Sequence, residues 1–373
     1  MNVRLLYIGT KIQKIRSGGD AGQRNWELQL QSLFKENFFP LYINDFSASN
    51  LKKVVSYLNL TPNANFYFLK KNIEQQIDRN SITIVFLCSS LYGCITAYIK
   101  KKYPSITVVT FFHNVEVLYG RAYLKFNNPK SWYFYLYSKY NEQKSVSFSD
   151  FLININSRDA DELFKVYGKM SDAVIPYTMQ NIFTKDQIIN KDKNKIKIKN
   201  YRALFVGSAF FGNIEGLQWF VQEILPYLPI KCVVVGAGMD KFFQSDDKLE
   251  VYGFVDDLGA FYENTDFVIL PIISGSGMKT KTAEAMMHGK IILGTTEAFT
   301  GYKIEKTKGL FCCNTLTEFQ NAIDVIYSGE FYNFNLNIFK LFSTHYSNDV
   351  VVPLIKQLFY EQIIPEAIKK SHV

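Results

Sequence analysis

The sequence is poor in the residues that build metal sites and cross-links. It has 5 cysteines and 4 histidines in 373 residues, and no group of His, Cys, Asp and Glu has the spacing of metal ligands. We therefore expect no bound metal and no disulfide framework. The odd number of cysteines and their mostly apolar surroundings favour reduced thiols in a cytosol. The first ten residues predict a strand and a polar loop rather than a secretory signal.

The chain also lacks internal repeats and long low-complexity tracts. One segment, 82–99, runs without a charge for the minimum length of a membrane helix. Its first six residues are strand-like, whereas Ser89 and Ser90 offer a turn and a helix cap, and Gly93 interrupts the remainder. A buried strand followed by a helix is therefore favoured over a membrane span.

Composition limits the class of protein and its partners. Hydrophobic residues make up 47% of the chain and charged residues 20%, which excludes wholesale disorder. A chain of 373 residues exceeds what one hydrophobic core usually serves, so two domains are expected. The formal net charge of +8 favours acidic partners such as phosphates or anionic lipid. Nucleic acid is not an expected partner, because the basic residues do not interleave with a known binding motif.

Short apolar strands alternate with helical stretches, a pattern typical of parallel βαβ units. The sequence predicts strands at 3–8, 82–87, 107–111 and 151–155, and a second set at 203–206, 232–235, 267–270 and 291–294.

These two sets predict an α/β fold of two Rossmann-like, doubly wound domains that face a central cleft, since ligands of such sheets bind at the carboxyl ends of the strands. The lysine-rich segment 185–200 has little to bury and is expected to be a linker or surface loop. We expect a first domain at 1–184, a second at 201–345, and an amphipathic C-terminal segment at 346–373 that forms one or two helices.

Residues 271–289, PIISGSGMKTKTAEAMMHG, combine the features of an anion-binding loop. An apolar strand ends at Pro271, a Gly/Ser loop follows, and helix formers run on to the next glycine. A glycine loop that feeds a helix start leaves backbone N–H groups unpaired, and the helix dipole favours an anion there. Lys279 and Lys281 in the first turn favour a shared anion, and Glu284 can accept hydrogen bonds from ligand hydroxyls. The alternative is a surface helix with solvated lysines.

This segment resembles the donor-binding signature of family 4 glycosyltransferases, enzymes of the two-domain GT-B architecture, and in particular their bacterial surface-polysaccharide branch. The matching residues are Gly275, Gly277, Lys279, Lys281, Glu284-Ala285-Met286, Gly289 and the strand at 290–296. Where many members have a first glutamate, eight residues before Glu284, this chain has Ser276. The resemblance implies that a nucleotide sugar contacts Ser274, Gly275, Ser276, Gly277, Met278, Lys279, Lys281 and Glu284.

Glycines also follow the first predicted strand. Gly18 and Gly19 form a second glycine loop before a helix that is expected to begin near residue 22. The resemblance implies that this loop and Arg24 face the diphosphate or the acceptor. A plain turn is the alternative.

A histidine, an amide and a carboxylate follow the strand at 107–111, at the end of the strand where cleft chemistry takes place. His113, Asn114 and Glu116 resemble the HNVE motif of the same branch. The resemblance implies that His113 lies near the transferred sugar and that Asn114 or Glu116 orients the acceptor or its loop. The alternative is a histidine that only bonds its own loop. After the next strand, Ser157 is expected to cap a helix rather than to act in catalysis.

Two further positions of the second domain resemble family members. Gly207 and Ser208 follow a predicted strand and by resemblance approach the nucleotide phosphates. No arginine or lysine occurs between Gly207 and Gln218, so the two lysines of the donor loop are expected to meet the phosphate charge. Phe254 lies in a loop that by resemblance flanks the base; in the alternative, this loop only begins a helix capped by Asp256.

Basic and aromatic residues of the first domain predict a membrane contact. Lysine pairs occur at 52–53 and 70–71, a triplet at 100–102, and an aromatic run at 132–137. This combination suits docking on an anionic bilayer, where a lipid-linked acceptor lies. Solvated lysines and a packed aromatic helix are the alternative. We expect a cytoplasmic protein that works at the inner face of the plasma membrane.

These residues and the resemblance predict a glycosyltransferase that moves a sugar from a nucleotide-diphosphate donor to a hydroxyl of a glycan or lipid-linked glycan acceptor, in capsule or O-antigen synthesis. The resemblance implies retention of anomeric configuration and a terminal helix that returns to the first domain. The nucleotide sugar is a substrate, so no resident cofactor is expected. Two alternatives stay open: a nucleotide-sugar epimerase on the same scaffold, and a degenerate transferase-like partner subunit.

Overall fold

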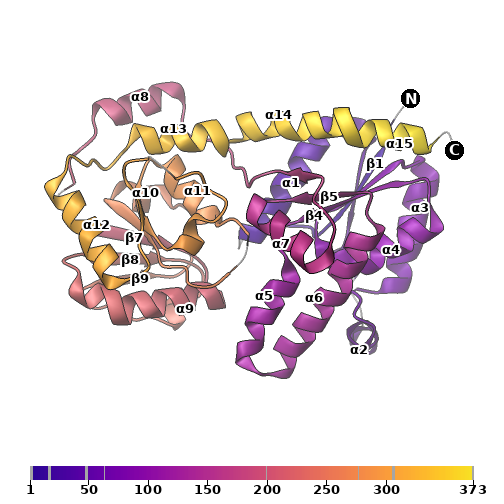
Figure 1. Ribbon diagram of the computed structural model, residues 1–373, viewed down its shortest axis with the longest axis horizontal. Helices are drawn as coiled ribbons and strands as arrows, with labels where there is room; N and C mark the ends of the chain where they lie inside the picture. The colour runs from indigo at the N-terminus through magenta and orange to yellow at the C-terminus, as the bar shows by residue number, and fades with distance from the viewer. Residues whose placement is uncertain are drawn as a thin grey trace. The chain divides into compact units, whose positions relative to one another are not determined.

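The computed structural model describes residues 3–15, 18–46, 49–62, 64–198, 200–275, 277–304 and 307–371. The chain divides into two compact units (Figure 1). Unit 1 comprises Met1–Ile15, Gly19–Pro176 and Val352–Val373, and unit 2 comprises Arg16–Gly18 and Tyr177–Val351. Each unit is built on its own six-stranded parallel sheet.

The sheet of unit 1 has the strand order β2-β1-β3-β4-β5-β6. Its strands are β1 Leu5–Gly9, β2 Phe38–Tyr42, β3 Ile84–Leu87, β4 Thr107–Phe112, β5 Phe151–Asn154 and β6 Ala173–Val174. Strands β1, β3 and β4 are buried at every residue, as expected where helices cover both faces of a parallel sheet. The chain doubles back between β1 and β3, which places a topological switch point at their carboxyl ends.

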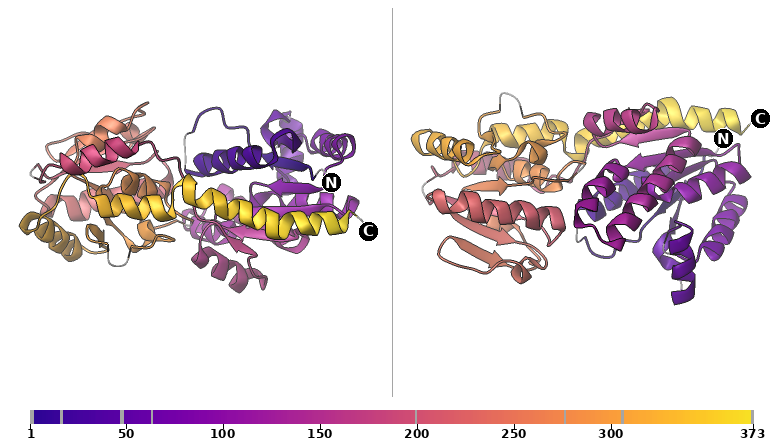
Figure 2. Two further views of the ribbon diagram at one scale, coloured as in Figure 1. Left: turned by 90° about the horizontal axis from the view of Figure 1, so that it is seen from above. Right: turned by 60° about the horizontal axis from the view of Figure 1, so that its bottom comes forward.

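Helices pack on both faces of this sheet (Figures 1 and 2). Between β1 and β6 the helices are α1 Gly18–Phe34, α2 Asn50–Leu58, α3 Phe66–Asn80, α4 Gly93–Lys102, α5 Glu116–Tyr123, α6 Pro129–Phe148 and α7 Ser157–Tyr167. Helix α6 begins with a capping box between Asn128 and Ser131 and has proline at its first position. The side chain of Asn156, not the expected Ser157, caps α7 by accepting from the amide of Asp159, so Ser157 is already the first helical residue.

The C-terminal segment continues through α14 Asn348–Leu358 and α15 Ile364–Lys370. Its last part belongs to unit 1. The ring of Phe359 meets Phe34 of α1 edge-on at 5.6 Å. The Nζ of Lys370 lies 2.6 Å from Oδ1 of Asp150, whose Oδ2 pairs with Lys100 at 2.7 Å. A half-buried carboxylate with two lysine partners thus holds the end of the chain on the first sheet.

The sheet of unit 2 has the order β12-β11-β10-β7-β8-β9. Its strands are β7 Arg202–Val206, β8 Lys231–Val235, β9 Leu249–Tyr252, β10 Phe267–Leu270, β11 Ile291–Gly294 and β12 Leu310–Cys312. Its helices are α8 Lys185–Lys193, α9 Phe211–Trp219, α10 Gly259–Glu263, α11 Thr280–Met287, α12 Leu316–Ser328 and α13 Leu336–His345. The α/β fold of two doubly wound units is therefore the one that the sequence predicts.

Two local expectations differ from the structure. The segment 185–200, expected to be a linker or surface loop, begins with helix α8, because Thr184 and Gln187 form a capping box at its start. This helix lies in unit 2, whose main segment begins at Tyr177 rather than at 201. Gly18 and Gly19, expected in a loop, occupy the first turn of α1.

The segment 82–99 is the predicted strand and helix, β3 and α4. Among the described residues, no helix combines the length and apolar character needed to cross a bilayer.

Candidate functional site

The glycine loop of unit 2 connects β10 to α11 at the carboxyl edge of the sheet. Gly275 has a φ of +148° and Gly277 a φ of +67°, so both adopt backbone conformations that favour glycine. Ser276 lies outside the described residues. The preceding turn packs on α9 at Gly216, where a Cβ atom would come within 1.9 Å of the carbonyl oxygen of Pro271. The loop is thus held by close backbone packing as well as by its own turn geometry.

Lys279 stands at the N-cap position of α11 and is largely enclosed, with 12% of its side chain exposed. Its Nζ donates to Oε1 of Glu297 at 2.7 Å and to the carbonyl of Gly277 at 3.0 Å. Glu297 lies in the turn after β11. The ion pair places an internal carboxylate against one of the two lysines expected to bind an anion.

Lys281 points toward β7 and the start of α9. Its Nζ donates to Oδ1 of Asn213 at 2.5 Å and lies 4.8 Å from the centre of the Phe205 ring. Burial, and next the charge of Lys279, lower the pKa of Lys281 to about 7. Burial also raises the pKa of Glu284 on the same helix to about 7, against the opposing effect of Lys281.

Gly207 and Ser208 follow β7 and lie beside Lys281. A Cβ atom on Gly207 would be 3.0 Å from Nζ of Lys281, and the Nδ2 of Asn213 donates to the carbonyl of Ser208 at 2.9 Å. Asn213 therefore bridges Lys281 to the turn after β7. This role could have been suspected from an asparagine in the first turn of a helix that follows a parallel strand.

The remaining predicted residues of unit 2 differ in their surroundings. Ser274 donates from Oγ to Oε2 of Glu215 at 2.7 Å, which ties the loop to α9. Met278 is buried, and its sulfur accepts from the amide of Tyr177 at 3.4 Å, so its side chain packs within the unit. Phe254 is 51% exposed on the separate loop after β9.

In unit 1, the predicted residues of α1 include an existing ion pair. Arg24 Nη1 lies 3.1 Å from Oε2 of Glu27, a residue only 4% exposed. The hydroxyl of Tyr42 donates to the other oxygen of Glu27 at 2.5 Å. Arg24 thus has a buried carboxylate as its partner.

His113 lies just after β4 and is partly buried. Nε2 is 3.0 Å from the carbonyl oxygen of Cys88, the Phe111 ring meets the imidazole edge-on at 4.7 Å, and α1 passes close by at Gly22. Burial lowers the pKa of His113 to about 4, so the ring is neutral at pH 7. A carbonyl can only accept, so Nε2 carries the proton and Nδ1 is left as an acceptor.

Asn114 and Glu116 lie at the start of α5, next to the buried carboxylate of Glu142. Glu142 was not identified from the sequence. Oδ1 of Asn114 is buried and has no hydrogen-bond partner among the described residues. Glu142 of α6 is fully buried and accepts from the amides of Glu116 and Val117 at 2.8 and 2.9 Å. It also accepts from Oγ of Ser90 and from the hydroxyl of Tyr167. Burial, and next the charge of Glu142, raise the pKa of Glu116 to about 8.

The structure thus gathers Gly207, Ser208, Lys279, Lys281 and the glycine loop within unit 2, and His113, Asn114 and Glu116 within unit 1. Among the residues that the structure describes, no cluster of three or more His, Cys, Asp or Glu side chains is arranged to hold a metal.

Comparison with a family model identifies the region that contains the glycine loop. Residues 200–328 match the model described as glycosyl transferases group 1. These residues are therefore a group 1 glycosyltransferase domain, a sugar-transferring enzyme domain. The match covers the strands β7 to β12 and includes both lysines of the loop.

One curated relative is 25% identical over 248 residues, the "uncharacterized 44.6 kDa protein in cps region" of Klebsiella pneumoniae. The alignment covers 61% of this chain and 59% of that protein, so the chain matches less than two thirds of the relative's length.

Solved structures share the fold over nearly the whole chain. Sucrose-phosphate synthase of Thermosynechococcus elongatus has a TM-score of 0.73 at 11% identity, over 97% of this chain and 100% of the other. HepE of Anabaena in complex with UDP has a TM-score of 0.65 at 12% identity, over 96% and 100%. A glycosyltransferase of Rickettsia africae has a TM-score of 0.59 at 14% identity, over 97% and 100%. The fold is thus that of the GT-B glycosyltransferases.

Proposed function

We propose that the whole chain is a glycosyltransferase that moves a sugar from a nucleotide-diphosphate donor to a hydroxyl of a glycan or lipid-linked glycan acceptor. The observation that carries this proposal is the convergence of Lys281, Asn213 and the turn at Gly207 beside the glycine loop, inside the group 1 glycosyltransferase domain. The relative from a cps region supports a role in bacterial surface polysaccharide synthesis.

The chemistry proposed for unit 2 is electrostatic. When the bond between the anomeric carbon and the diphosphate oxygen breaks, the electron pair stays on the diphosphate, which gains charge. Lys279, Lys281 and the amides at the start of α11 stabilise that charge. The acceptor oxygen forms the new bond to the anomeric carbon and gives its proton to the departing diphosphate, and the family pattern supports retention of configuration. Glu284 accepts hydrogen bonds from the donor's ribose hydroxyls.

The role proposed for unit 1 is to hold the sugar and the acceptor. A neutral His113 with a free lone pair on Nδ1 accepts a hydrogen bond from a sugar hydroxyl, rather than donating one to the departing oxygen. The unsatisfied Oδ1 of Asn114 is a second acceptor. Glu116, whose raised pKa favours the protonated carboxyl, can donate a hydrogen bond to the acceptor.

A binding experiment tests the donor site. HepE has been solved with UDP and with UDP-glucose, so uridine nucleotides are the first probes to use. UDP should raise the melting temperature of the protein in a saturable manner, and Lys281→Ala should abolish the rise. The matched control is Lys340→Ala, an exposed lysine of α13, which should leave the rise unchanged. Absence of binding by any nucleoside diphosphate, or binding that Lys281→Ala does not weaken, contradicts the proposal.

An activity experiment separates the possible reactions. Nucleotide sugars are incubated with the protein, with and without a lipid-linked glycan acceptor, and nucleotide release is measured together with the products. Release that depends on acceptor supports a transferase. An epimer formed without acceptor indicates an epimerase, and donor binding without any turnover indicates a degenerate partner subunit.

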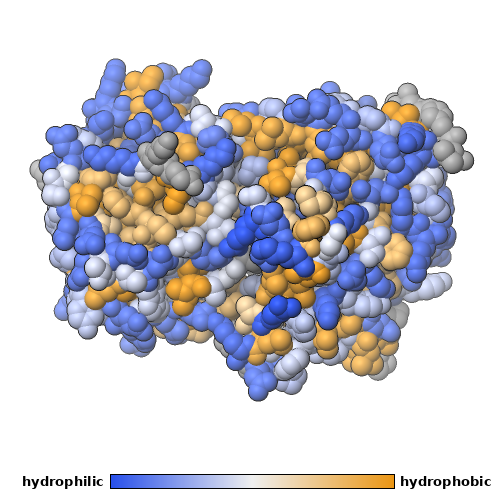
Figure 3. All heavy atoms as spheres, viewed as in Figure 1, coloured by the Kyte–Doolittle hydropathy of each residue, from blue (hydrophilic) through white to orange (hydrophobic). Residues whose placement is uncertain are grey.

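We also propose a peripheral contact of unit 1 with an anionic membrane. Helix α2 projects from the rest of unit 1 in Figures 1 and 2, and Tyr57 of α2 stacks on Tyr133 of α6 at 3.6 Å. Figure 3, in the view of Figure 1, shows apolar groups among hydrophilic ones over this end of the unit. The exposed apolar side chains of α2, α3 and α6 are Val54, Val55, Tyr57, Leu58, Tyr67, Phe68, Trp132, Leu136 and Tyr140.

Exposed basic side chains lie on the same helices, among them Lys53, Lys71 and Lys139. The aromatic run at 132–137 is partly packed and partly exposed. The hydroxyl of Tyr137 donates to the carbonyl of Leu91, whereas Trp132 is 50% exposed. Sedimentation with phosphatidylglycerol vesicles should bring down the protein, and phosphatidylcholine vesicles should not. Leu58→Ser with Val55→Ser should weaken this binding, and Tyr227→Ser on unit 2 should not. Equal binding to both lipids, or none, contradicts the membrane contact.

A further inference from the structure

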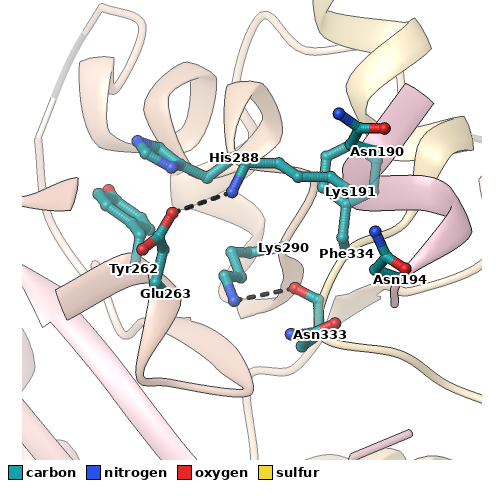
Figure 4. Close-up of a pocket in the computed structure, with 9 residues that line it drawn as sticks. All are labelled: Asn190, Lys191, Asn194, Tyr262, Glu263, His288, Lys290, Asn333 and Phe334. Carbon is teal, nitrogen blue, oxygen red and sulfur yellow. Dashed lines mark hydrogen bonds and ion pairs between the residues drawn. The ribbon is translucent and has the colours of Figure 1, made fainter. Parts of the chain in front are cut away.

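Unit 2 contains a cavity of about 330 Å³ at the edge of the sheet opposite the donor loop (Figure 4). Lys290, on its wall, immediately precedes β11, so the cavity is at the amino edge of the strands, whereas the glycine loop is at their carboxyl edge. Helix α11 runs from one edge to the other, and its eight residues span about 12 Å. The cavity is therefore distinct from the proposed donor site.

Lys290 is a buried cation without a carboxylate in contact. It is 3% exposed, and its Nζ donates to the carbonyl of Thr265 at 2.7 Å and to that of Asn333 at 2.9 Å. An ammonium group has three N–H donors, and two are used by these carbonyls. No carboxylate of the described residues lies within ion-pair distance of it. Burial lowers the pKa of Lys290 to about 8, against the opposing charge of Asp266, so the group is still mostly charged at pH 7 and a bound anion would raise its pKa.

A second lysine stands at the rim. Lys191 of α8 pairs with Oε1 of Glu263 at 3.1 Å, and Figure 4 shows this pair beside the cavity. The side chain of Glu263 is 65% exposed and that of Lys191 is 28% exposed, so the carboxylate can turn to solvent while the lysine stays at the cavity. The exposed amides of Asn190 and Asn194 complete this rim.

We propose that this cavity binds a phosphate group, held between the ammonium groups of Lys290 and Lys191 after Glu263 has released Lys191. The ligand is inorganic phosphate or the phosphate of a small phosphorylated sugar. The volume lies at the lower end of small-molecule sites, which suits a ligand of this size. The amides of the rim supply donors to phosphate oxygens or partners for sugar hydroxyls.

The cavity is in contact with the helix that carries the donor lysines. His288, the C-cap residue of α11, lines the cavity and stacks on Tyr262 with ring centres 4.0 Å apart and planes at 5°. Tyr262 in turn interacts electrostatically with Glu284 on α11. A phosphate at this site would therefore lie at the end of the helix whose start is proposed to bind the donor diphosphate.

Calorimetry with inorganic phosphate, a hexose 6-phosphate and the unphosphorylated hexose tests the proposal. The Lys281→Ala protein is the background, because Lys281 is the lysine proposed to bind phosphate at the donor site. We expect saturable binding of phosphate or hexose phosphate and none of the hexose. Lys191→Met should weaken it about tenfold, because one charged hydrogen bond is lost. Glu263→Gln should strengthen it, and Lys340→Met should leave it unchanged.

The outcomes are distinguishable. Tighter binding of the hexose phosphate than of phosphate supports a phosphorylated sugar as ligand, and equal binding supports inorganic phosphate. Lys290→Met should abolish binding, and where it prevents folding, Lys191→Met and Glu263→Gln provide the test. Absence of saturable binding in the Lys281→Ala protein, or binding that Lys191→Met and Glu263→Gln both leave unchanged, overturns the proposal. None of these readouts depends on donor turnover.

Discussion

The carboxylate of Glu142 accepts a hydrogen bond from the backbone amide of Glu116 at 2.8 Å, and a second from the next amide at 2.9 Å. A side chain in the middle of α6 thus fixes the first turn of α5, directly after His113 and Asn114. The first amides of a helix have no partner within the helix, and the fully buried carboxylate of Glu142 accepts from two of them.

Glu142→Gln should weaken this support while keeping the size of the side chain. An amide oxygen can replace one carboxylate acceptor but not both, so we expect a loss of about 1–3 kcal/mol in the free energy of unfolding. The negative charge next to Glu116 also disappears, so the pKa of Glu116 should fall from about 8. Chemical denaturation measures the first effect and carboxyl-carbon NMR titration the second. An unchanged Glu116 titration would contradict the electrostatic link between the two residues.

Binding of UDP should weaken as the pH rises above 7. The pKa of Lys281 is about 7 in the empty site, and a diphosphate favours the charged lysine and raises that pKa. Binding therefore takes up a proton between the free and the bound pKa, and affinity should fall by up to about tenfold per pH unit there. Calorimetry in two buffers with different ionisation enthalpies measures the uptake. Lys281→Arg, which stays charged, should lose this uptake; the same pH dependence in that variant would exclude Lys281 as its source.

Glu297→Gln should increase the affinity for UDP. Glu297 holds Nζ of Lys279 at 2.7 Å, and a bound diphosphate has to compete with that carboxylate. Both side chains are largely enclosed, 12% and 19% exposed, so the loss of a buried partner for Lys279 offsets part of this effect, and the expected net gain is about twofold to fivefold. The control is Glu263→Gln, which removes a carboxylate from the opposite edge of unit 2 and should leave UDP binding unchanged. Weaker binding by Glu297→Gln would show that the carboxylate helps to place Lys279 for the ligand.

Gly216→Ala should damage both the stability of unit 2 and its donor binding. The added Cβ would lie 1.9 Å from the carbonyl oxygen of Pro271, which is backbone and cannot turn aside. Overpacking of this kind costs about 1–3 kcal/mol and would displace the start of the glycine loop. Gly168→Ala in unit 1 is the control, because nothing lies within 4 Å of the added atom and only its φ of +69° is unfavourable. Thermal unfolding and UDP titration of both variants measure the difference.

Much of the fold could be predicted from hydrophobic runs. All eight predicted strands are present, because buried parallel strands such as β3 and β10 are apolar at every residue. The missed strands lack that signal. β2 contains Pro40, β6 has two residues, and β9 and β12 are short and partly exposed. Helix α8 was missed because its lysines suggested a loop, although its capping box at Thr184 is visible in the sequence.

The candidate site could be predicted only where its residues are close in sequence. Lys279, Lys281 and the glycines form one continuous segment, so their spacing in the sequence was enough to predict an anion-binding loop. Their partners Asn213 and Glu297 come from other loops, and only the folded structure brings them to the lysines. Glu142 was hidden for the same reason, since it lies in an aromatic helix 26 residues beyond the amide of Glu116.

The ion pairs of Lys370 and Lys100 with Asp150 have a consequence for the synthesis of the protein. Val352–Val373 belong to the first unit but follow the second unit in the sequence. They are therefore synthesised after all of the second unit. During translation, the patch around Phe34 therefore stays uncovered until Phe359 has been synthesised. A chain truncated before residue 352 would therefore contain all of the second unit but lack the segment that covers Phe34 in the first.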